Sequence, residues 1–317
     1  VSSICRRQRL DAQKLENYFK KNFYELISNP KKADFILLFT CAFKDKDVKR
    51  SFRLIKKFKK YNGELILAGC LPAMYPKKLK ENFDGKSVTT KDLNKLDDFF
   101  ESKYVELKDI VDSNFLWNNI VEIGFSGFIK KLFRKLNSPN NLYYKLKKNI
   151  FRKFYKEKLN YARSIKEKQD SYYISISEGC LGNCSYCSVK KAVGNLQSKP
   201  LSKCIEEFKK GLDLGYKNFI LLAEDHGAYG KDINSDFPTL LDEFLKIKGN
   251  YEIDIGLIHP VWFVKYAEEF QKLLSGNKIK KICIPVQSGS NRILNLMNRY
   301  SNVEKIIETF NNLKKVN

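Results

Sequence analysis

The sequence predicts an α/β protein, with a small N-terminal parallel α/β domain followed by an incomplete barrel of parallel strand and helix units. In both halves, short buried strand-like runs alternate with amphipathic helical segments, which is the order that parallel sheets require. The chain stops after the fourth strand and helix unit of the second half, so we expect an open, TIM-like partial β/α barrel and a chain that is a fragment. The expected domain boundaries are 1–103, 104–169 and 170–317.

The N-terminal domain is expected to contain two buried strands with a helix between them. The runs ADFILLFTC (33–41) and ELILAGC (64–70) are continuously apolar, as buried parallel strands are. Residues 45–61 between them have helical spacing and end at Asn62-Gly63. An amphipathic helix at 11–26 precedes the first strand, and a strand-like SVTT and a helix around 92–103 follow the second.

The second domain is expected to begin with an alternating strand that delivers Cys180 and to continue as strand and helix units. Turn signals between the units, such as Gly215 after the first helix, mark where each helix ends. The expected strands are 170–180, 218–225, 251–258 and 278–286, and the expected helices are 201–215, 237–247, 262–276, 291–296 and 302–315.

The composition is that of a globular and strongly basic protein. The apolar fraction is 43% and the formal net charge is +23. The chain opens VSSICRRQRLD, without the apolar core of a signal peptide, and no apolar run approaches a membrane span, so we expect a cytoplasmic protein whose cysteines are reduced. The charge favours nucleic acid or anionic lipid as a partner. The alternative is that a chain rich in Lys, Asn, Ile and Phe reflects an AT-rich genome.

The middle segment 104–169 reads as a linker or insertion. Residues 120–158 contain eleven Lys or Arg but only two Glu, and aromatic residues are interleaved with the basic ones. Phe125, Ile129 and Leu132 share one face of an expected amphipathic helix, with lysines opposite. Such a helix packs on its own protein, lies on an anionic membrane or covers a nucleic acid.

Three cysteines within eight residues form the strongest chemical signal in the chain. Cys180, Cys184 and Cys187 follow directly after an expected strand. Three thiolates on one loop can hold three irons of a cubane cluster and leave the fourth open to a small molecule. A structural zinc site would need a fourth Cys or His, and no second pair follows. The spacing therefore predicts an iron-sulfur cluster with one open iron.

Further polar residues are expected at the carboxyl ends of the parallel strands, where such sheets bind ligands. Cys41 and Cys70 end the two N-terminal strands, and Cys5 precedes the first helix, so these three cysteines form either one metal site or a chance grouping of small buried residues. In the second domain, strand-end acids also cap helices, and a serine there can be an N-cap. The strand-end residues of that domain are Glu224, Asp225, His259, Gln287 and Ser288.

The Cys-x3-Cys-x2-Cys spacing, with Tyr186 before the third cysteine, resembles the radical SAM superfamily. GCLGNCSYCSVKKAVGNLQSKP, LLAEDHGAYGKD and IPVQSGSNRILNLMNR are similar in sequence and order to the central domain of the radical SAM methylthiotransferases. TCAFKDKD and AGCLPAMYP are similar to the first domain of that family. GCLGNCSYC and EDHGAYGKD look most like the branch that acts on threonylcarbamoyladenosine in tRNA. The first-cysteine segment Ser-Ile-Cys5-Arg-Arg-Gln departs from the usual Gly-Cys followed by Asn, and the resemblance does not extend over about 104–165.

The resemblance implies a transferase that inserts sulfur into an unactivated C–H bond and methylates it. The implied reaction is 2-methylthiolation of an N6-threonylcarbamoyladenosine-type base next to the anticodon of tRNA. The implied cofactors are S-adenosyl-L-methionine (SAM) and two [4Fe-4S] clusters. Implied partners are tRNA and a reductant such as flavodoxin or ferredoxin, with the protein a monomer. The alternatives are a methylthiotransferase acting on a protein or peptide side chain, and a non-catalytic iron-sulfur or RNA-binding protein.

The resemblance also assigns roles to residues. Cys180, Cys184 and Cys187 would be the catalytic cluster ligands, with SAM on the open iron, and Cys5, Cys41 and Cys70 would hold the second cluster. Contacts with SAM would come from Tyr186 near the adenine, from Glu224 and Asp225 at the ammonium group or ribose hydroxyls, and from Gln287 and Ser288 at the methionine or ribose portion.

Overall fold

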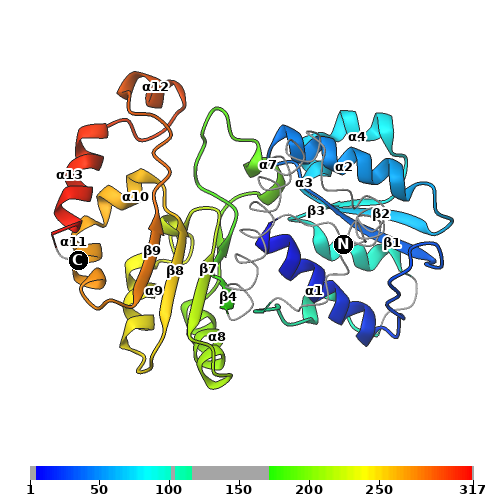
Figure 1. Ribbon diagram of the computed structural model, residues 1–317, viewed down its shortest axis with the longest axis horizontal. Helices are drawn as coiled ribbons and strands as arrows, with labels where there is room; N and C mark the ends of the chain where they lie inside the picture. The colour runs from blue at the N-terminus through cyan, green and yellow to red at the C-terminus, as the bar shows by residue number, and fades with distance from the viewer. Residues whose placement is uncertain (1–4, 101–103, 116–170, 316–317) are drawn as a thin grey trace, which may run out of the picture. The chain divides into compact units, whose positions relative to one another are not determined.

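The computed structural model describes residues 5–100, 104–115 and 171–315 of the 317-residue chain, and the predicted basic amphipathic helix within 120–158 lies outside these ranges (Figure 1). The described residues form two parallel sheets and one short antiparallel pair of strands. The predicted fold class, an N-terminal parallel α/β domain followed by an incomplete parallel β/α barrel, is confirmed.

The N-terminal domain is a three-stranded parallel sheet, in the order β1-β2-β3, with helices on both faces. Alternate residues of a strand point to opposite faces, so β2 serves two cores. Leu65 and Leu67 pack with the face covered by α2, whereas Ile66 and Ala68 pack with the face covered by α1 (Figure 1). The elements are α1 (Arg6–Lys21), β1 (Phe35–Thr40), α2 (Asp45–Phe58), β2 (Glu64–Gly69), α3 (Cys70–Met74), α4 (Pro76–Asn82), β3 (Ser87–Thr89), η1 (Leu93–Phe99) and η2 (Leu107–Asp109).

Helix α1 begins and ends earlier than the helix predicted at 11–26. The Cys5 thiol accepts a hydrogen bond from the backbone N–H of Gln8 at 3.4 Å and caps the first turn. The helix stops at Lys21, because Asn22 caps its end and Phe23 takes a left-handed φ of 63°. The side chain of Phe23 is accordingly exposed.

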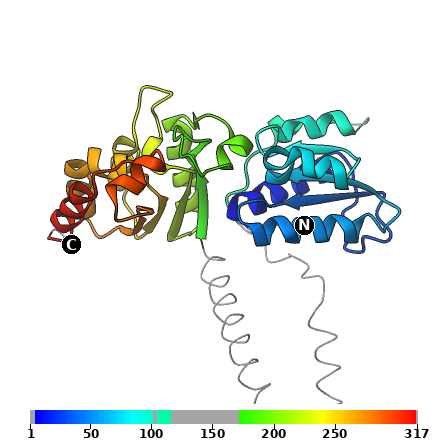
Figure 2. The ribbon, with the colours of Figure 1, turned by 90° about the horizontal axis from the view of Figure 1, so that it is seen from above.

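The second domain is built on a four-stranded parallel sheet in the order β4-β7-β8-β9. Its core combines apolar residues of these strands with Phe208 of α8, Phe237 and Phe244 of α9, Phe263 of α10 and Phe270 of α11. Figure 2 shows the ribbon of this domain, coloured green to red, from above. The strands are β4 (Ser171–Ser175), β7 (Asn218–Leu222), β8 (Glu252–Leu257) and β9 (Ile279–Cys283), and the helices are α8 (Leu201–Asp213), α9 (Phe237–Lys246), α10 (Pro260–Lys265), α11 (Ala267–Leu274), α12 (Asn291–Leu296) and α13 (Val303–Leu313), with η3 (His226–Ala228).

The segment between β4 and α8 leaves the sheet and forms a loop whose two ends are joined. Strand β5 (Ser177–Glu178) pairs antiparallel with β6 (Gln197–Ser198), and the short helix α7 (Val189–Val193) lies between them. Gly179, directly after β5, has a φ of +77°, and a Cβ there would lie 1.9 Å from the carbonyl oxygen of Asn195. Only glycine therefore permits the close approach that shuts this loop.

Candidate functional site

The loop closed by β5 and β6 carries Cys180, Cys184 and Cys187. The backbone N–H of Gly182 donates to the Cys180 Sγ at 3.2 Å, and a Cβ on Gly182 would lie 3.2 Å from that sulfur and 3.9 Å from the Cys184 Sγ. Burial raises the pKa of the Cys180 thiol, and the nearby Cys184 and Cys187 raise it further. The loop thus folds so that the thiols of Cys180 and Cys184 both lie close to Gly182.

The residues that follow α12 hold this loop from the far end of the sequence. The Ser185 N–H donates to the carbonyl oxygen of Met297 at 3.0 Å, and the Asn298 side chain donates to the carbonyl oxygen of Asn183 at 2.8 Å. These bonds join segments that are more than a hundred residues apart in the sequence, which fixes the loop against the second domain.

Arg299 contributes a cation beside the cysteine loop. Its guanidinium donates to the Cys184 Sγ at 3.4 Å, to the Tyr186 hydroxyl at 3.1 Å and to the carbonyl oxygen of Pro285 at 2.6 Å. These three bonds tie the cysteine loop to the segment before Gln287. Sequence reasoning did not select Arg299, since a single arginine after a helix carries no spacing signal, although it lies in one of the segments quoted for the family resemblance.

The two strand-end acids after β7 have different partners. Glu224 accepts an ion-paired hydrogen bond from the Arg7 guanidinium at 2.5 Å, and its second carboxylate oxygen is buried without a hydrogen-bond partner among the described residues. Asp225 accepts from the backbone N–H of His259 at 3.0 Å and from the Trp262 indole N–H at 2.9 Å. Burial raises the pKa of both carboxyl groups despite these donors. Asp225 therefore holds the start of α10, which is the capping role that the sequence left open.

His259 is the N-cap of α10 and accepts a hydrogen bond from the Val261 N–H at 3.3 Å. Burial, together with the charge of Arg299, lowers its pKa to about 4, so the imidazole is neutral near pH 7. His259 thus has a structural role, because its side chain caps the first turn of α10.

The turn after β9 carries Gln287 and Ser288. Gln287 is exposed and has a left-handed φ of 78°, a conformation that favours glycine and that costs a side-chain-bearing residue free energy. The Ser288 hydroxyl accepts from the Ser290 N–H at 3.1 Å, and Ser290, not Ser288, is the N-cap of α12. Half-exposed Tyr186 and exposed Gln287 both leave side-chain surface free on this side of the sheet.

The N-terminal domain gathers its three cysteines at the carboxyl end of its sheet. Thr40 and Gly69 are register partners on neighbouring strands, so Cys41 and Cys70, which follow them, lie at the same edge. Taking the thiol out of water raises the pKa of Cys5 to about 12, and the nearby Cys70 and Cys41 add to the rise. The structure thus brings together three cysteines that are far apart in the sequence: Cys41 follows Cys5 by 36 positions, and Cys70 follows Cys41 by 29.

The chemistry of these two sets of thiols fits an iron-sulfur cluster better than a single metal ion. No three Cys, His, Asp or Glu side chains among the described residues converge closely enough to ligate one ion. A cubane instead takes its thiolates on separate irons and so accepts a wider spacing. Three thiols in each set would leave one iron without a protein ligand.

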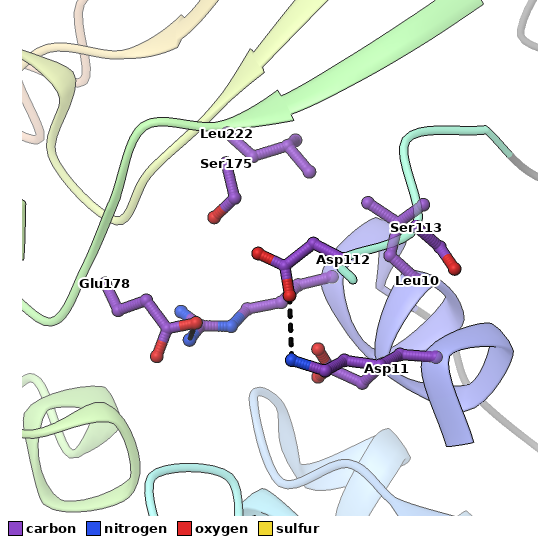
Figure 3. A pocket seen from close by; sticks show the side chains of 9 residues that line it. Leu10, Asp11, Asp112, Ser113, Ser175, Glu178 and Leu222 are labelled. Carbon is purple, nitrogen blue, oxygen red and sulfur yellow. Dashed lines mark hydrogen bonds and ion pairs between the residues drawn. The ribbon is translucent and has the colours of Figure 1, made fainter. Parts of the chain in front are cut away.

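Elements next to the two sets of thiols touch each other. Helix α3, which begins at Cys70, packs against α7, which follows the Cys180–Cys187 loop. Arg7, two residues after Cys5, also pairs with Glu178 at 2.6 Å, directly before that loop. Figure 3 shows the small charged pocket beside this pair, which is lined by Arg7, Leu10, Asp11, Lys14, Asp112, Ser113, Ser175, Glu178 and Leu222. The ionic network therefore joins the start of α1 to the strand ends of the second domain.

Two protein-family models match the chain. The radical SAM superfamily model matches residues 174–317, and the model described as uncharacterized protein family UPF0004 matches residues 3–90. Two solved structures share the fold over nearly the whole chain. The cobalamin-dependent SAM radical enzyme OxsB has a TM-score of 0.54 at 13% identity over 96% of this chain and 41% of its own. The radical SAM methyltransferase TsrM from Kitasatospora setae has a TM-score of 0.52 at 12% identity over 97% and 60%.

Curated relatives match over the same length. A probable threonylcarbamoyladenosine tRNA methylthiotransferase of Pyrococcus abyssi is 28% identical over 98% of this chain and 64% of its own length. A ribosomal protein uS12 methylthiotransferase RimO of Chlamydia felis is 27% identical over 99% and 61%. The chain thus spans less than two thirds of the length of these relatives.

The family uses SAM and [4Fe-4S] clusters, of which its methylthiotransferases carry two, in agreement with the two sets of three thiols. The order of the two matched domains, the gathered cysteines and the named relatives agree with one another. The chain therefore carries a radical SAM domain over residues 174–317, preceded by a UPF0004 domain over residues 3–90, and it is similar over nearly its whole length to proteins named methylthiotransferases.

Proposed function

We propose that this protein is a methylthiotransferase that replaces a C–H hydrogen of a threonylcarbamoyladenosine-type base, next to the anticodon of tRNA, with a methylthio group. The observation that carries the proposal is the contact between α3, which begins at Cys70, and α7, which follows the loop of Cys180, Cys184 and Cys187. The archaeal relatives named as threonylcarbamoyladenosine tRNA methylthiotransferases support tRNA as the substrate. The basic charge of +23 supports a polyanionic partner.

In this proposal the cysteines divide the work. Cys180, Cys184 and Cys187 hold the cluster that binds SAM, while Cys5, Cys41 and Cys70 hold the second. When bound, these groups supply the one-electron chemistry and the sulfur that an unactivated C–H bond requires. Arg299 donates a hydrogen bond to the Cys184 Sγ, and the closed loop and its hydrogen bonds to residues 297 and 298 hold the thiols in place.

Five further residues are proposed to contact SAM. Tyr186 and Gln287 have free side-chain surface near the loop and the β9 turn, which supports the adenine and methionine contacts assigned to them. Glu224 keeps one buried oxygen unpaired, which is able to accept from an ammonium or hydroxyl group. Both oxygens of Asp225 already accept hydrogen bonds, so its contact with SAM would share them. Ser288 would contact SAM with a hydroxyl that also caps the local turn.

A protein side chain is the second candidate substrate. Relatives named ribosomal protein uS12 methylthiotransferase match this chain at nearly the same identity as the tRNA-modifying ones, 27% and 26% against 27% and 28%. An identity this similar does not favour either substrate. We infer for either case a cytoplasmic monomer that receives electrons from flavodoxin or ferredoxin. Among the described helices, none is long and apolar enough to cross a membrane.

The test is anaerobic reconstitution with iron, sulfide, SAM and a chemical reductant. The protein is then incubated either with tRNA lacking the methylthio group or with ribosomal protein uS12, and the products are analysed by mass spectrometry. A methylthio-nucleoside is expected in the tRNA arm, and methylthiolated protein would replace the tRNA assignment by the second candidate. If 5'-deoxyadenosine does not form, the protein is not catalytic.

Two variants separate the roles of the clusters. Cys180→Ala should abolish 5'-deoxyadenosine formation, because the cluster that binds SAM loses a ligand. Cys41→Ala should preserve SAM cleavage and abolish sulfur insertion. Sulfur insertion by Cys41→Ala would contradict the assignment of the N-terminal cysteines.

A further inference from the structure

Gln8 is a buried polar residue that reaches all three cysteine-bearing segments of the N-terminal domain. Its side chain is 1% exposed. The backbone N–H donates to the Cys5 Sγ at 3.4 Å, and the side-chain Nε2 donates to the carbonyl oxygen of Thr40, directly before Cys41, at 2.9 Å. The same Nε2 lies 3.7 Å from the Cys70 Sγ. Through this one side chain, the start of α1 is linked with the ends of both β1 and β2.

The Thr40 carbonyl fixes the orientation of the Gln8 amide. An amide flipped by 180° would set its own oxygen against that carbonyl oxygen, and two acceptors repel each other, so the nitrogen must face Thr40. An amide nitrogen carries two hydrogens. One is used by the Thr40 carbonyl at 2.9 Å, and the other is available to the Cys70 sulfur at 3.7 Å.

Two observations indicate that this position is built for the amide donor. Gly69 has a φ of +109°, and a Cβ there would lie 2.7 Å from the Gln8 Nε2, so the end of β2 leaves space for the amide only as glycine. The amide oxygen, Oε1, is buried without a hydrogen-bond partner among the described residues. A buried unpaired oxygen costs stability. The Gln8 side chain thus places its Nε2 donor between two partners, while its Oε1 acceptor has none among the described residues.

We propose that Gln8 is a positioning residue of the N-terminal three-cysteine site, which spaces Cys5, Cys41 and Cys70 around a [4Fe-4S] cluster and donates an N–H···S hydrogen bond to the Cys70 ligand. The inference depends on the proposed function, because it requires that cluster. Hydrogen bonds to cluster sulfurs are among the factors that set the reduction potential. A donor stabilises the more negative, reduced state, so Gln8 makes the potential of this cluster more positive.

The test uses the protein with Cys180, Cys184 and Cys187 all replaced by Ala, so that only the N-terminal cluster contributes to the spectrum. After reconstitution, the potential is measured by redox titration with EPR detection, and bound iron is measured chemically. Gln8→Leu has a similar volume and no donor, and it should shift the potential of the bound cluster to a more negative value.

Ser51→Ala is the matched control. The Ser51 hydroxyl is buried and, among the described residues, bonds the backbone of Cys41, accepting from its N–H at 3.0 Å and donating to its C=O at 2.8 Å. Its loss disturbs a cysteine segment without removing an N–H···S bond, so the potential should remain that of the parent protein. An equal shift in Ser51→Ala would show that Gln8 acts only through general packing.

A measurement without substitution covers the case in which Gln8→Leu fails to fold. Protein labelled with 15N at the glutamine side chains should show hyperfine coupling between an amide nitrogen and the reduced cluster. Absence of this coupling, or an unchanged potential in folded Gln8→Leu, overturns the inference alone. Absence of any iron bound at the three N-terminal cysteines would overturn the proposed function as well, so the two failures are distinguishable.

Discussion

Replacing Gly179 by Ala should open the loop that carries Cys180, Cys184 and Cys187. Gly179 has a φ of +77°, where a residue with a Cβ costs roughly 1–2 kcal/mol. Its added methyl group would also lie 1.9 Å from the carbonyl oxygen of Asn195, which is backbone and cannot rotate away. The β5–β6 pair has to separate to relieve that overlap, so the total cost exceeds the conformational cost alone.

Gly215→Ala isolates the conformational part of this cost. Gly215 follows α8 with a similar φ of +83°, but a Cβ there meets nothing within 4 Å. A loss of about 1–2 kcal/mol from φ alone should therefore leave the cysteine loop intact. For a domain of 150–250 residues, each kcal/mol lowers the melting temperature by about 2–4 °C.

The assay compares iron bound after anaerobic reconstitution with the melting temperature of each variant, in a background that keeps Cys180, Cys184 and Cys187 and has Cys5, Cys41 and Cys70 replaced by Ala. Gly179→Ala should melt at a lower temperature than Gly215→Ala and bind less iron, whereas Gly215→Ala should bind iron like the parent. Equal melting temperatures and equal iron in the two variants would refute the inference that loop closure positions the thiols.

Three further predictions follow from single side chains. Burial raises the pKa of Asp11 to about 7 despite its neighbour Arg7, so ionisation of this carboxyl group destabilises the folded state as pH rises from about 4 through about 7. In urea unfolding, the stability of Asp11→Asn should therefore increase relative to that of the parent over this pH range. A difference in unfolding free energy that stays constant with pH would contradict this. Arg299→Leu should lower the iron bound by Cys180, Cys184 and Cys187, since the hydrogen bond to the Cys184 Sγ is lost. An iron content equal to that of the parent would refute a role of Arg299 in holding this loop. Asp225→Asn keeps only one acceptor, so it should cost about 1–3 kcal/mol and change Trp262 fluorescence in a Trp117→Phe background; an unchanged spectrum would show that the cap is not used.

Sequence patterning predicted the sheets better than the ends of the helices. Buried parallel strands read as continuous apolar runs, and the strands predicted at 33–41 and 64–70 formed as β1 and β2. Local patterns could not reveal that Cys5 caps α1, because capping depends on one thiol lying at the first turn. The helix predicted at 262–276 also divides into α10 and α11 at Tyr266, where apolar spacing continues although the backbone turns.

Local sequence patterns likewise predicted the clustered cysteines but not the residues that contact them from distant parts of the chain. Spacing alone indicated Cys180, Cys184 and Cys187, because the three ligands come from one short loop. Arg299 and Arg7 act on partners 115 and 217 positions away, so only folding reveals them. The pairing of Glu224 with Arg7 was likewise hidden, since a strand-end acid has the same appearance in sequence whether it meets a cofactor or an arginine.

The bonds from residues 297–299 to the cysteine loop have a consequence for the newly made chain. Asn298 follows Asn183 by 115 residues, which corresponds to about 6–23 s of synthesis at 5–20 residues per second. Once Cys187 has been added, the ribosome has produced all three thiols of the loop, but for the rest of that interval residues 297–299 do not yet exist. Cluster assembly on the clamped loop must therefore follow translation of Arg299, and a messenger RNA broken before that codon yields thiols without the clamp.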